Sequence, residues 1–220
     1  MAPESLVELA PAFTQCAKQY RSRREEAESA AIEWRWASAP LFSLELLRFE
    51  RGGHRRGRYL KKEPANNDDR CQYGLDVAGR IVVERHAIWG SEQHKVETFV
   101  RYGEEFAESA QYGSMQDKPL DMLVSLAISN AAPQSCRWYS SHQRGSDTYR
   151  YDEGRLSEID SLWSNQPHRD QDLLSAVFQC NYDATGALSL VTVEYRKLGR
   201  HPGGRFTCFR LPKRRPGGQG

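Results

Sequence analysis

The sequence predicts a mainly β fold of the α+β class, in which an N-terminal helix packs on a meandering antiparallel sheet of hairpins, with one short additional helix. Residues 4–36 indicate the N-terminal helix, because apolar side chains such as Leu6, Leu9 and Phe13 recur at steps of three and four. From residue 41 onward, short runs rich in β-branched and aromatic residues alternate with glycine-containing turns, which is typical of hairpins.

The strands follow from this alternation, and most of them pair with the next one across a short turn. The expected strands are 41–50 and 57–63, 71–76 and 80–89, 95–102 and 106–112, 136–141, 148–151, 156–163, 175–183 and 187–197, and 205–211. The short additional helix is expected after residue 117, because Asp117 can cap it and Pro119 suits its first turn. Leu120, Leu123 and Ala127 then line one face of that helix.

Three segments follow from the patterns: an N-terminal helical segment 1–38, an antiparallel β-rich domain 39–211 and a flexible tail 212–220. The tail reads PKRRPGGQG and is too polar and too rich in proline and glycine to order itself. Residues 195–220 carry eight lysines and arginines and no acidic residue, although the net charge of the chain is only +2.

The sequence argues against membrane and secreted classes. No apolar run approaches the roughly 18 residues of a membrane span. The N-terminus shows no basic region followed by an apolar one, so no secretion signal is expected. The five cysteines are far apart and form no CxxC pair, which favours reduced thiols in the cytoplasm.

Common catalytic motifs are missing from the sequence. The six histidines include no pair at i,i+4 and no HExxH, so a zinc site lacks its ligands. The phosphate-binding patterns GxGxxG and GxxxxGK[ST] and the nucleophile pattern GxSxG are also missing. We therefore expect no enzyme, no bound metal and no cofactor.

One carboxylate arrangement outlines a metal-dependent nuclease. Asp183 precedes a strand that carries Glu194 and Arg196, and paired carboxylates of this kind hold Mg²⁺ in such sites. Arg196 cannot lose a proton as a catalytic lysine can, and Asp183 has a role in the turn. The structural interpretation of Asp183 is therefore favoured over the nuclease.

Three turns share a pattern in which a tyrosine and an aspartate precede a glycine. The glycines are Gly79, Gly154 and Gly186; Asp76, Asp152 and Asp183 precede them, and Tyr73, Tyr151 and Tyr182 lie just upstream. The aspartate accepts backbone N–H groups in the turn and the glycine supplies the positive φ. The pattern resembles the YD repeat of bacterial Rhs and YD-repeat proteins, although the turns have no fixed period and depart from the family in length and in the arginine. Small cytosolic proteins with such turns often accompany polymorphic toxins as immunity proteins, which is what the resemblance implies here.

The middle of the chain is acidic. Residues 71–194 contain ten lysines and arginines against eighteen aspartates and glutamates, a balance of −8. An acidic face can mimic phosphate and steer a basic active-site cleft, and aromatic anchors then supply affinity. The candidate acidic residues are Glu92, Glu97, Glu104, Glu105 and Glu108, near Asp117 and Asp121, and the candidate anchors are Trp89, Tyr102, Tyr112, Trp138 and Tyr139.

The function favoured by these observations is an intracellular immunity protein that binds a cognate bacterial toxin domain and covers its active site. The alternative is a nucleic-acid-binding protein or nuclease that uses Asp183 and Glu194 together with a basic patch. That patch comprises Arg51, Arg55, Arg56, Arg58, Lys61 and Lys62. A third interpretation is a structural or secretion-associated accessory protein without an inhibitory role.

Overall fold

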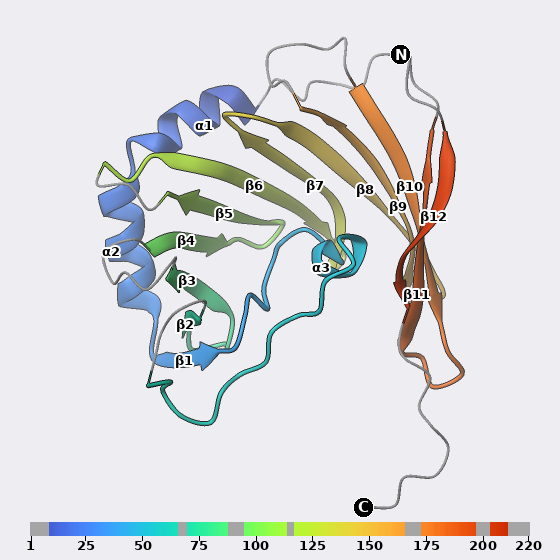
Figure 1. Cartoon of the computed structure of the whole chain (residues 1–220). Helices are drawn as coiled ribbons and strands as arrows, with labels where there is room; N and C mark the ends of the chain where they lie inside the picture. The colour runs from blue at the N-terminus through green and yellow to red at the C-terminus, as the bar shows by residue number, and fades with distance from the viewer. Residues whose placement is uncertain are drawn as a thin grey trace, which may run out of the picture.

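The computed structural model describes residues 9–65, 70–87, 95–113, 117–165, 173–196 and 203–210. The described residues form three helices and one antiparallel sheet of twelve strands (Figure 1). The helices are α1 (Leu9–Ala17), α2 (Tyr20–Ala30) and α3 (Arg48–Arg51). The strands are β1 (Glu33–Ala37), β2 (Cys71–Leu75), β3 (Ile81–Ala87), β4 (Lys95–Tyr102), β5 (Phe106–Tyr112), β6 (Leu120–Ser129), β7 (Ala132–Ser140), β8 (Arg144–Asp152), β9 (Arg155–Ser164), β10 (Leu173–Tyr182), β11 (Leu188–Tyr195) and β12 (Gly204–Arg210).

Every strand pairs with its neighbours in the chain, so the sheet runs in order from β1 to β12. Figure 1 shows that the sheet is strongly curved, with α1 and α2 on its outer face and the segment that carries α3 on its inner, concave face. Helix α1 packs on β6 and β7, α2 packs on β3 and β4, and α3 reaches β11 and β12. The predicted fold class, a helix-flanked meander of antiparallel hairpins, is confirmed.

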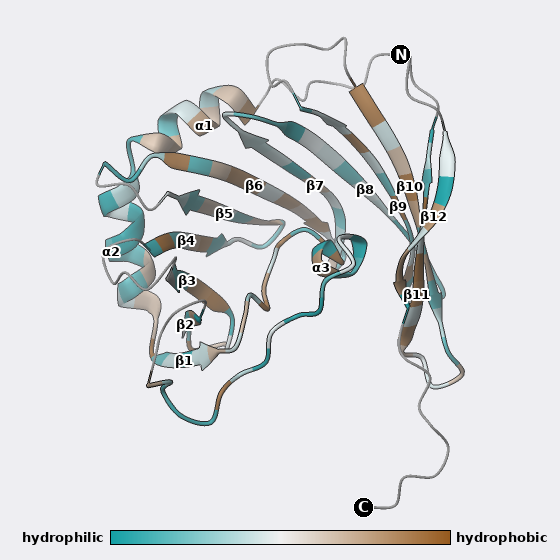
Figure 2. Cartoon of the chain, in the orientation of Figure 1, coloured by the Kyte–Doolittle hydropathy of each residue, from teal (hydrophilic) through white to brown (hydrophobic). Residues whose placement is uncertain are grey.

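Both faces of the sheet carry a core. Phe99, Tyr112 and Leu123 are buried between the sheet and the two N-terminal helices. On the concave face the core is larger and includes Tyr149 and Ile159. Figure 2 shows hydrophobic residues concentrated along the strands and hydrophilic ones over much of α2, as expected for a helix with one buried face.

The positive φ predicted for the glycine is confirmed in all three turns, and the predicted role of the aspartate is confirmed in the first and the last. Gly79, Gly154 and Gly186 have φ values of 74°, 76° and 81°, in the left-handed region that favours glycine. In the first turn Asp76 Oδ1 accepts the N–H groups of Ala78 and Arg80, both at 2.9 Å. Asp183 makes the same pattern in the last hairpin, so its structural role is shown.

The helix predicted after Asp117 is wrong, because residues 120–129 form β6. Met122 and Val124 face the concave core, whereas Leu120 and Leu123 face α1 and α2. Because both faces of this strand are covered, its apolar residues do not alternate with polar ones. The resulting run imitates helical spacing, and periodicity alone does not separate the two. The short additional helix is α3 instead.

The hairpin predicted over 41–50 and 57–63 is also wrong. This stretch crosses the concave face as irregular chain and contains α3; its link to the sheet near Tyr59 is an isolated bridge to Ala37. The helical segment predicted for residues 1–38 ends at Ala30, and the sheet begins at Glu33. The predicted tail 212–220 lies outside the described residues. Among the described residues, no helix is long and apolar enough to cross a membrane.

Candidate functional site

Residues 38–60, which we call the crossing segment, leave the sheet at β1 and return to it beside the same strand. The Ser38 N–H donates to the Arg58 carbonyl at 3.0 Å, and the Gly57 N–H donates to the Pro40 carbonyl at 2.8 Å. Between these two ends the chain extends over the concave face as far as β11 and β12. It therefore forms a loop with closed ends and a distant tip, the geometry of an Ω-loop.

Two buried tyrosines hold the crossing segment against the sheet. The Tyr73 hydroxyl accepts the Leu41 N–H at 3.0 Å, and the Tyr149 hydroxyl accepts the Leu46 N–H at 3.3 Å. Leu44 is buried between these contacts in the concave core. The irregular backbone of the segment thus finds hydrogen-bond partners on the strands, as buried backbone groups require.

A buried ion pair anchors the tip of the crossing segment. The Arg51 guanidinium lies 2.9 Å from the carboxylate of Asp147, whose side chain is fully buried on β8. The Ser161 hydroxyl donates to Asp147 and accepts a hydrogen bond from Arg51 at 3.1 Å. Arg51 also lies over the ring of Phe178, 5.0 Å from its centroid. Both charges are paired and hydrogen-bonded, which is the condition for burying them.

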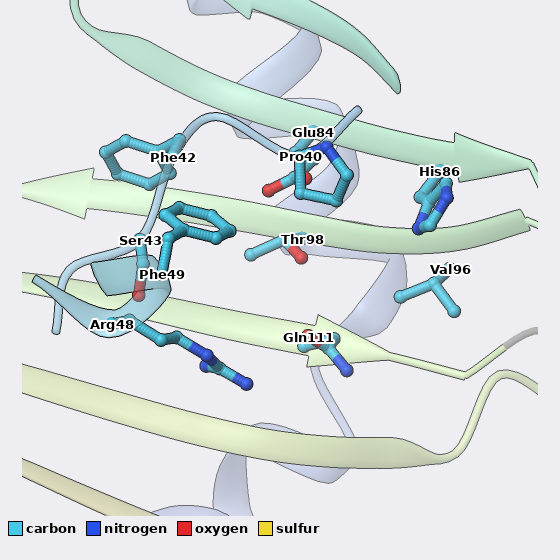
Figure 3. Close-up of a pocket in the computed structure, with 10 residues that line it drawn as sticks. All are labelled: Pro40, Phe42, Ser43, Arg48, Phe49, Glu84, His86, Val96, Thr98 and Gln111. Atoms are coloured by element: carbon cyan, nitrogen blue, oxygen red, sulfur yellow. The ribbon is translucent and has the colours of Figure 1, made fainter. Parts of the chain in front are cut away.

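A cavity of about 270 Å³ lies between the crossing segment and strands β3, β4 and β5. Figure 3 shows that Glu84 and His86 enter it from β3, Thr98 and Val96 from β4, and Gln111 from β5. The crossing segment supplies the opposite wall, with two phenylalanines and one arginine. These residues are Pro40, Phe42, Ser43, Arg48 and Phe49.

Glu84 supplies the carboxyl group of this cavity, and its side chain is half-buried. The Tyr73 hydroxyl donates to its Oε1 at 2.9 Å; among the described residues, no other hydrogen bond and no ion pair to Glu84 is present. Burial raises the pKa of Glu84 to about 7, against the smaller opposing effects of the Tyr73 hydrogen bond and the Arg48 charge. A titratable group perturbed in this way inside a cavity is a candidate functional residue.

Arg48 closes the cavity on the side of α3. Its guanidinium pairs with the Glu45 carboxylate at 2.6 Å, and Glu45 also lies 3.5 Å from Arg51. Burial raises the pKa of Glu45, which belongs to the crossing segment. Arg48 is therefore already engaged by an acid other than Glu84.

Arg48 also lines a second cavity, of about 280 Å³, on its other side. Four aromatic side chains dominate the walls of this second cavity: Trp138, Trp163, Phe178 and Tyr195. Gly145 leaves room for them, because a Cβ at Gly145 would lie 2.2 Å from an atom of the Trp138 ring. The polar residues that line the second cavity include Glu45 and Arg51, which already take part in the anchor of the crossing segment.

The predicted acidic face is divided by the structure. Glu104 and Glu105 are exposed in the turn between β4 and β5. Glu108 pairs with Arg23 at 2.6 Å, and Glu97 is buried on the helix side of the sheet. Glu97 is thus not available on the surface, and Glu92 lies outside the described residues.

Glu97 is held there by three partners. The Tyr20 hydroxyl donates to it at 2.6 Å, and the cations of Lys118 and Arg85 each lie 3.3 Å away. Although burial alone raises the pKa of Glu97, the Tyr20 hydrogen bond and the charges of Lys118 and Arg24 hold it below its usual value. Because its charge is paired inside the protein, Glu97 belongs to the core rather than to a surface that binds a partner.

The predicted aromatic anchors lie mostly in the core. Tyr112, Trp138 and Tyr139 are buried, so their assignment as surface anchors is wrong. The Tyr112 hydroxyl donates to the carbonyl of Cys16 in α1, at 2.9 Å. Tyr102 is half-buried and donates to the Ile81 carbonyl at 2.9 Å, and Trp89 lies outside the described residues.

The predicted basic patch is divided as well. Arg51 is the buried anchor described above, so its assignment to an exposed patch is wrong. Arg56 is exposed and pairs with Glu50 at 2.8 Å. The remaining members, Arg55, Arg58, Lys61 and Lys62, are exposed on the returning half of the crossing segment and just beyond it.

Asp183 and Glu194 do not form a joint site. Glu194 pairs across the sheet with Val177, six residues along β10 from Asp183, which corresponds to about 20 Å at the rise of a strand. Arg196 instead contacts Asp160 at 3.1 Å. Within the described ranges, no group of three or more histidine, cysteine, aspartate or glutamate side chains is arranged to hold a metal ion.

Comparison with protein-family models, with curated proteins and with solved structures finds no match. The resemblance of the turns to YD repeats therefore stays a prediction. The candidate site rests on the geometry of the cavity alone.

The anchor of the crossing segment can be tested by substitution. Arg51→Met leaves the Asp147 carboxylate buried without a counter-ion, which we expect to lower the free energy of unfolding by about 3–5 kcal/mol. The double substitution Arg51→Met with Asp147→Leu removes both charges and should recover most of that loss. Arg55→Met, at an exposed arginine nearby, should change it by less than about 0.5 kcal/mol. Denaturant unfolding measures all three; equal effects of Arg51→Met and Arg55→Met would contradict the anchor.

The raised pKa of Glu84 predicts how stability depends on pH. The folded protein holds this proton up to about pH 7, whereas the unfolded chain releases it near the ordinary glutamate pKa of 4.5. Stability should therefore fall as the pH rises through that window, by about 3 kcal/mol at most. Glu84→Gln keeps an acceptor for Tyr73 and removes the charge, so it should unfold less readily than wild type at about pH 8 but not at about pH 4.5. If the free energies of unfolding of Glu84→Gln and wild type differ by the same amount at both pH values, Glu84 does not titrate in this window.

Proposed function

We propose that this protein binds a small molecule in the cavity between the crossing segment and strands β3 to β5. The observation that carries the proposal is the Glu84 carboxyl, which lines this cavity, is half-buried and has no ion-pair partner among the described residues. An acid that is partly removed from water without a cation costs stability, and such a cost is typical of groups retained for a function.

The cavity has the composition of a ligand site. Its walls combine apolar side chains, Phe42, Phe49 and Val96, with a few polar groups that converge on the same space. Ligand sites usually have this composition, with volumes from about 300 Å³ for drug-sized molecules. At about 270 Å³ the cavity suits a smaller molecule. The proposed activity is binding, without a chemical step, bound metal or cofactor.

The architecture supports the same proposal. The curved sheet supplies a rigid floor, because each strand of the cavity is hydrogen-bonded on both sides. The crossing segment supplies a wall that is anchored on β2 and β8 through Tyr73 and Asp147. Side chains held by rigid elements keep a fixed geometry, which favours specific binding.

Filling the cavity tests the proposal. Thr98 lies on the floor of the cavity (Figure 3), and Thr98→Phe should occupy most of the space while preserving strand propensity. The control is Thr207→Phe, at an exposed position on β12. A library of small polar molecules is screened for compounds that raise the melting temperature of wild type. These compounds should also raise the melting temperature of Thr207→Phe. They should bind Thr98→Phe at least tenfold more weakly than they bind wild type. Binding that Thr98→Phe leaves intact would place the ligand elsewhere and overturn the proposal.

A second candidate function is the binding of a cognate bacterial toxin domain in the cytoplasm, as an immunity protein. The observation that favours it is the tip of the β4–β5 hairpin, where Glu104, Glu105 and Phe106 are exposed, the phenylalanine by 50%. Adjacent carboxylates beside an exposed ring combine electrostatic steering with an apolar anchor. The tip would meet a basic surface on the toxin.

Charge reversal tests this second candidate. Glu104→Lys with Glu105→Lys should slow association with the toxin domain encoded by a neighbouring gene, measured on a biosensor. Raising the salt concentration from about 0.05 to about 0.5 M should slow the association of wild type similarly, because the screening length shrinks from about 14 to about 4 Å. The control, Glu153→Lys with Glu194→Lys, makes the same change of net charge at exposed positions elsewhere. Salt-independent association would contradict the steering, and tight binding to plain DNA would favour the nucleic-acid alternative through Arg55, Arg58, Lys61 and Lys62.

A further inference from the structure

We infer that the ligand of the Glu84 cavity is a small organic cation, an amine or a quaternary ammonium compound, with the Glu84 carboxylate as its counter-ion. The inference rests on the proposed binding function and names the chemistry of the ligand. It follows from three features of the cavity: the pairing of its charges, its aromatic walls and the position of its titratable groups.

The first feature is charge pairing. Two buried carboxylates have cations of the chain within ion-pair distance: Asp147 has Arg51 at 2.9 Å, and Asp76 has Arg80 at 2.8 Å. The half-buried Glu84 has no such partner among the described residues. Within the crossing segment, Arg48 pairs with Glu45 and Arg51 pairs with Asp147. With all three acids ionised, this cluster carries one negative charge in excess, which a monovalent cation in the cavity would neutralise.

The second feature is the aromatic wall. Phe42 and Phe49 line the cavity from the crossing segment, and in Figure 3 the ring of Phe49 points toward Thr98. A cation within about 6 Å of a ring centroid is stabilised by the ring, and this effect grows as water is excluded. Phe49 already accepts Arg56 in this way, at 5.6 Å, whereas among the described residues no cation lies over Phe42. An ammonium group beside the Glu84 carboxylate would lie in a cavity whose opposite wall contains both rings.

The third feature is the set of titratable groups around Glu84. From β2, Tyr73 and Cys71 face it, and burial raises the pKa of both, to about 12 for Cys71. From the crossing segment Arg48 faces it, and from its own strand His86 lies two residues further on the same face. The groups on β2 are thus neutral at physiological pH, and Arg48 is shared with Glu45. The positive charge that would complement an ionised Glu84 has to come from a ligand.

This arrangement makes binding depend on pH. Only the ionised form of Glu84 attracts a cation, and its pKa without ligand is raised to about 7 by burial. Above that pH the carboxylate is ready to bind. Below it, each binding event must also displace a proton, so the affinity for a cation should fall tenfold for each unit of pH.

Matched probes test the inference. The cations are 3-methylbutylamine and choline, the neutral probe is 3-methylbutanol and the anion is 3-methylbutanoate; the first, third and fourth share one alkyl group and differ in charge. Isothermal titration at about pH 8 should show binding of at least one cation and at least tenfold weaker binding of the neutral probe and the anion. Glu84→Gln should weaken the cation at least tenfold, whereas Glu104→Gln, at an exposed glutamate, should not. Wild type at about pH 5.5 should also bind it at least tenfold more weakly, a result that does not depend on the folding of a variant.

The outcomes separate this inference from the proposed function. A neutral or anionic compound that Thr98→Phe excludes and Glu84→Gln does not affect would overturn the cationic ligand and leave the binding cavity in place. A cation whose affinity is the same at both pH values and in Glu84→Gln would also overturn it. If no compound of any charge is excluded by Thr98→Phe, both the proposed function and this inference fail.

Discussion

The buried ion pair between Arg51 and Asp147 is the interaction on which the rest of the concave face depends. Its acid is fully buried on β8 and its base lies at the tip of the crossing segment, so the pair joins the segment to the middle of the sheet. Two charges removed from water stabilise a structure only when each satisfies the other. The crossing segment is therefore held in one position, and both cavities exist because their shared wall, the turn of α3, is fixed there.

The position of the crossing segment also explains the amino-acid pattern of the strands. A sheet with one face in water alternates apolar and polar residues, whereas this sheet is covered by helices on one face and by the crossing segment on the other. In β6 both Leu123 and Val124 are consequently buried, although they point in opposite directions. The chain thereby builds two cores from a modest number of aliphatic residues, with buried tyrosines and their hydrogen bonds completing each.

Local signals made the meander and its turns predictable, whereas the crossing segment depends on contacts distant in sequence. Gly79 and Gly186 mark their turns by a conformation that other residues rarely adopt, so no knowledge of the rest of the chain is needed. By contrast, Arg51 finds Ser161 across 110 residues, and nothing near Arg51 in sequence distinguishes it from Arg55. The expected hairpin over 41–63 failed for this reason, since its apolar residues are buried against other strands rather than against each other.

The same limit applies to the candidate site, where two glutamates of similar local sequence have opposite roles. Glu84 and Glu97 both lie on central strands, and the acidic composition of the region favoured Glu97 as a surface residue. In the structure Glu97 is paired with Lys118 and Arg85, and the Tyr20 hydrogen bond with the charges of Lys118 and Arg24 holds its pKa down. Glu84 has only a tyrosine as its hydrogen-bond partner, and burial raises its pKa to about 7. The alternation of β3 does place Glu84 and His86 on one face, but the sequence does not reveal that the crossing segment covers that face. A paired buried acid is compatible with a stable fold, whereas an acid left without a counter-ion costs stability as it is removed from water.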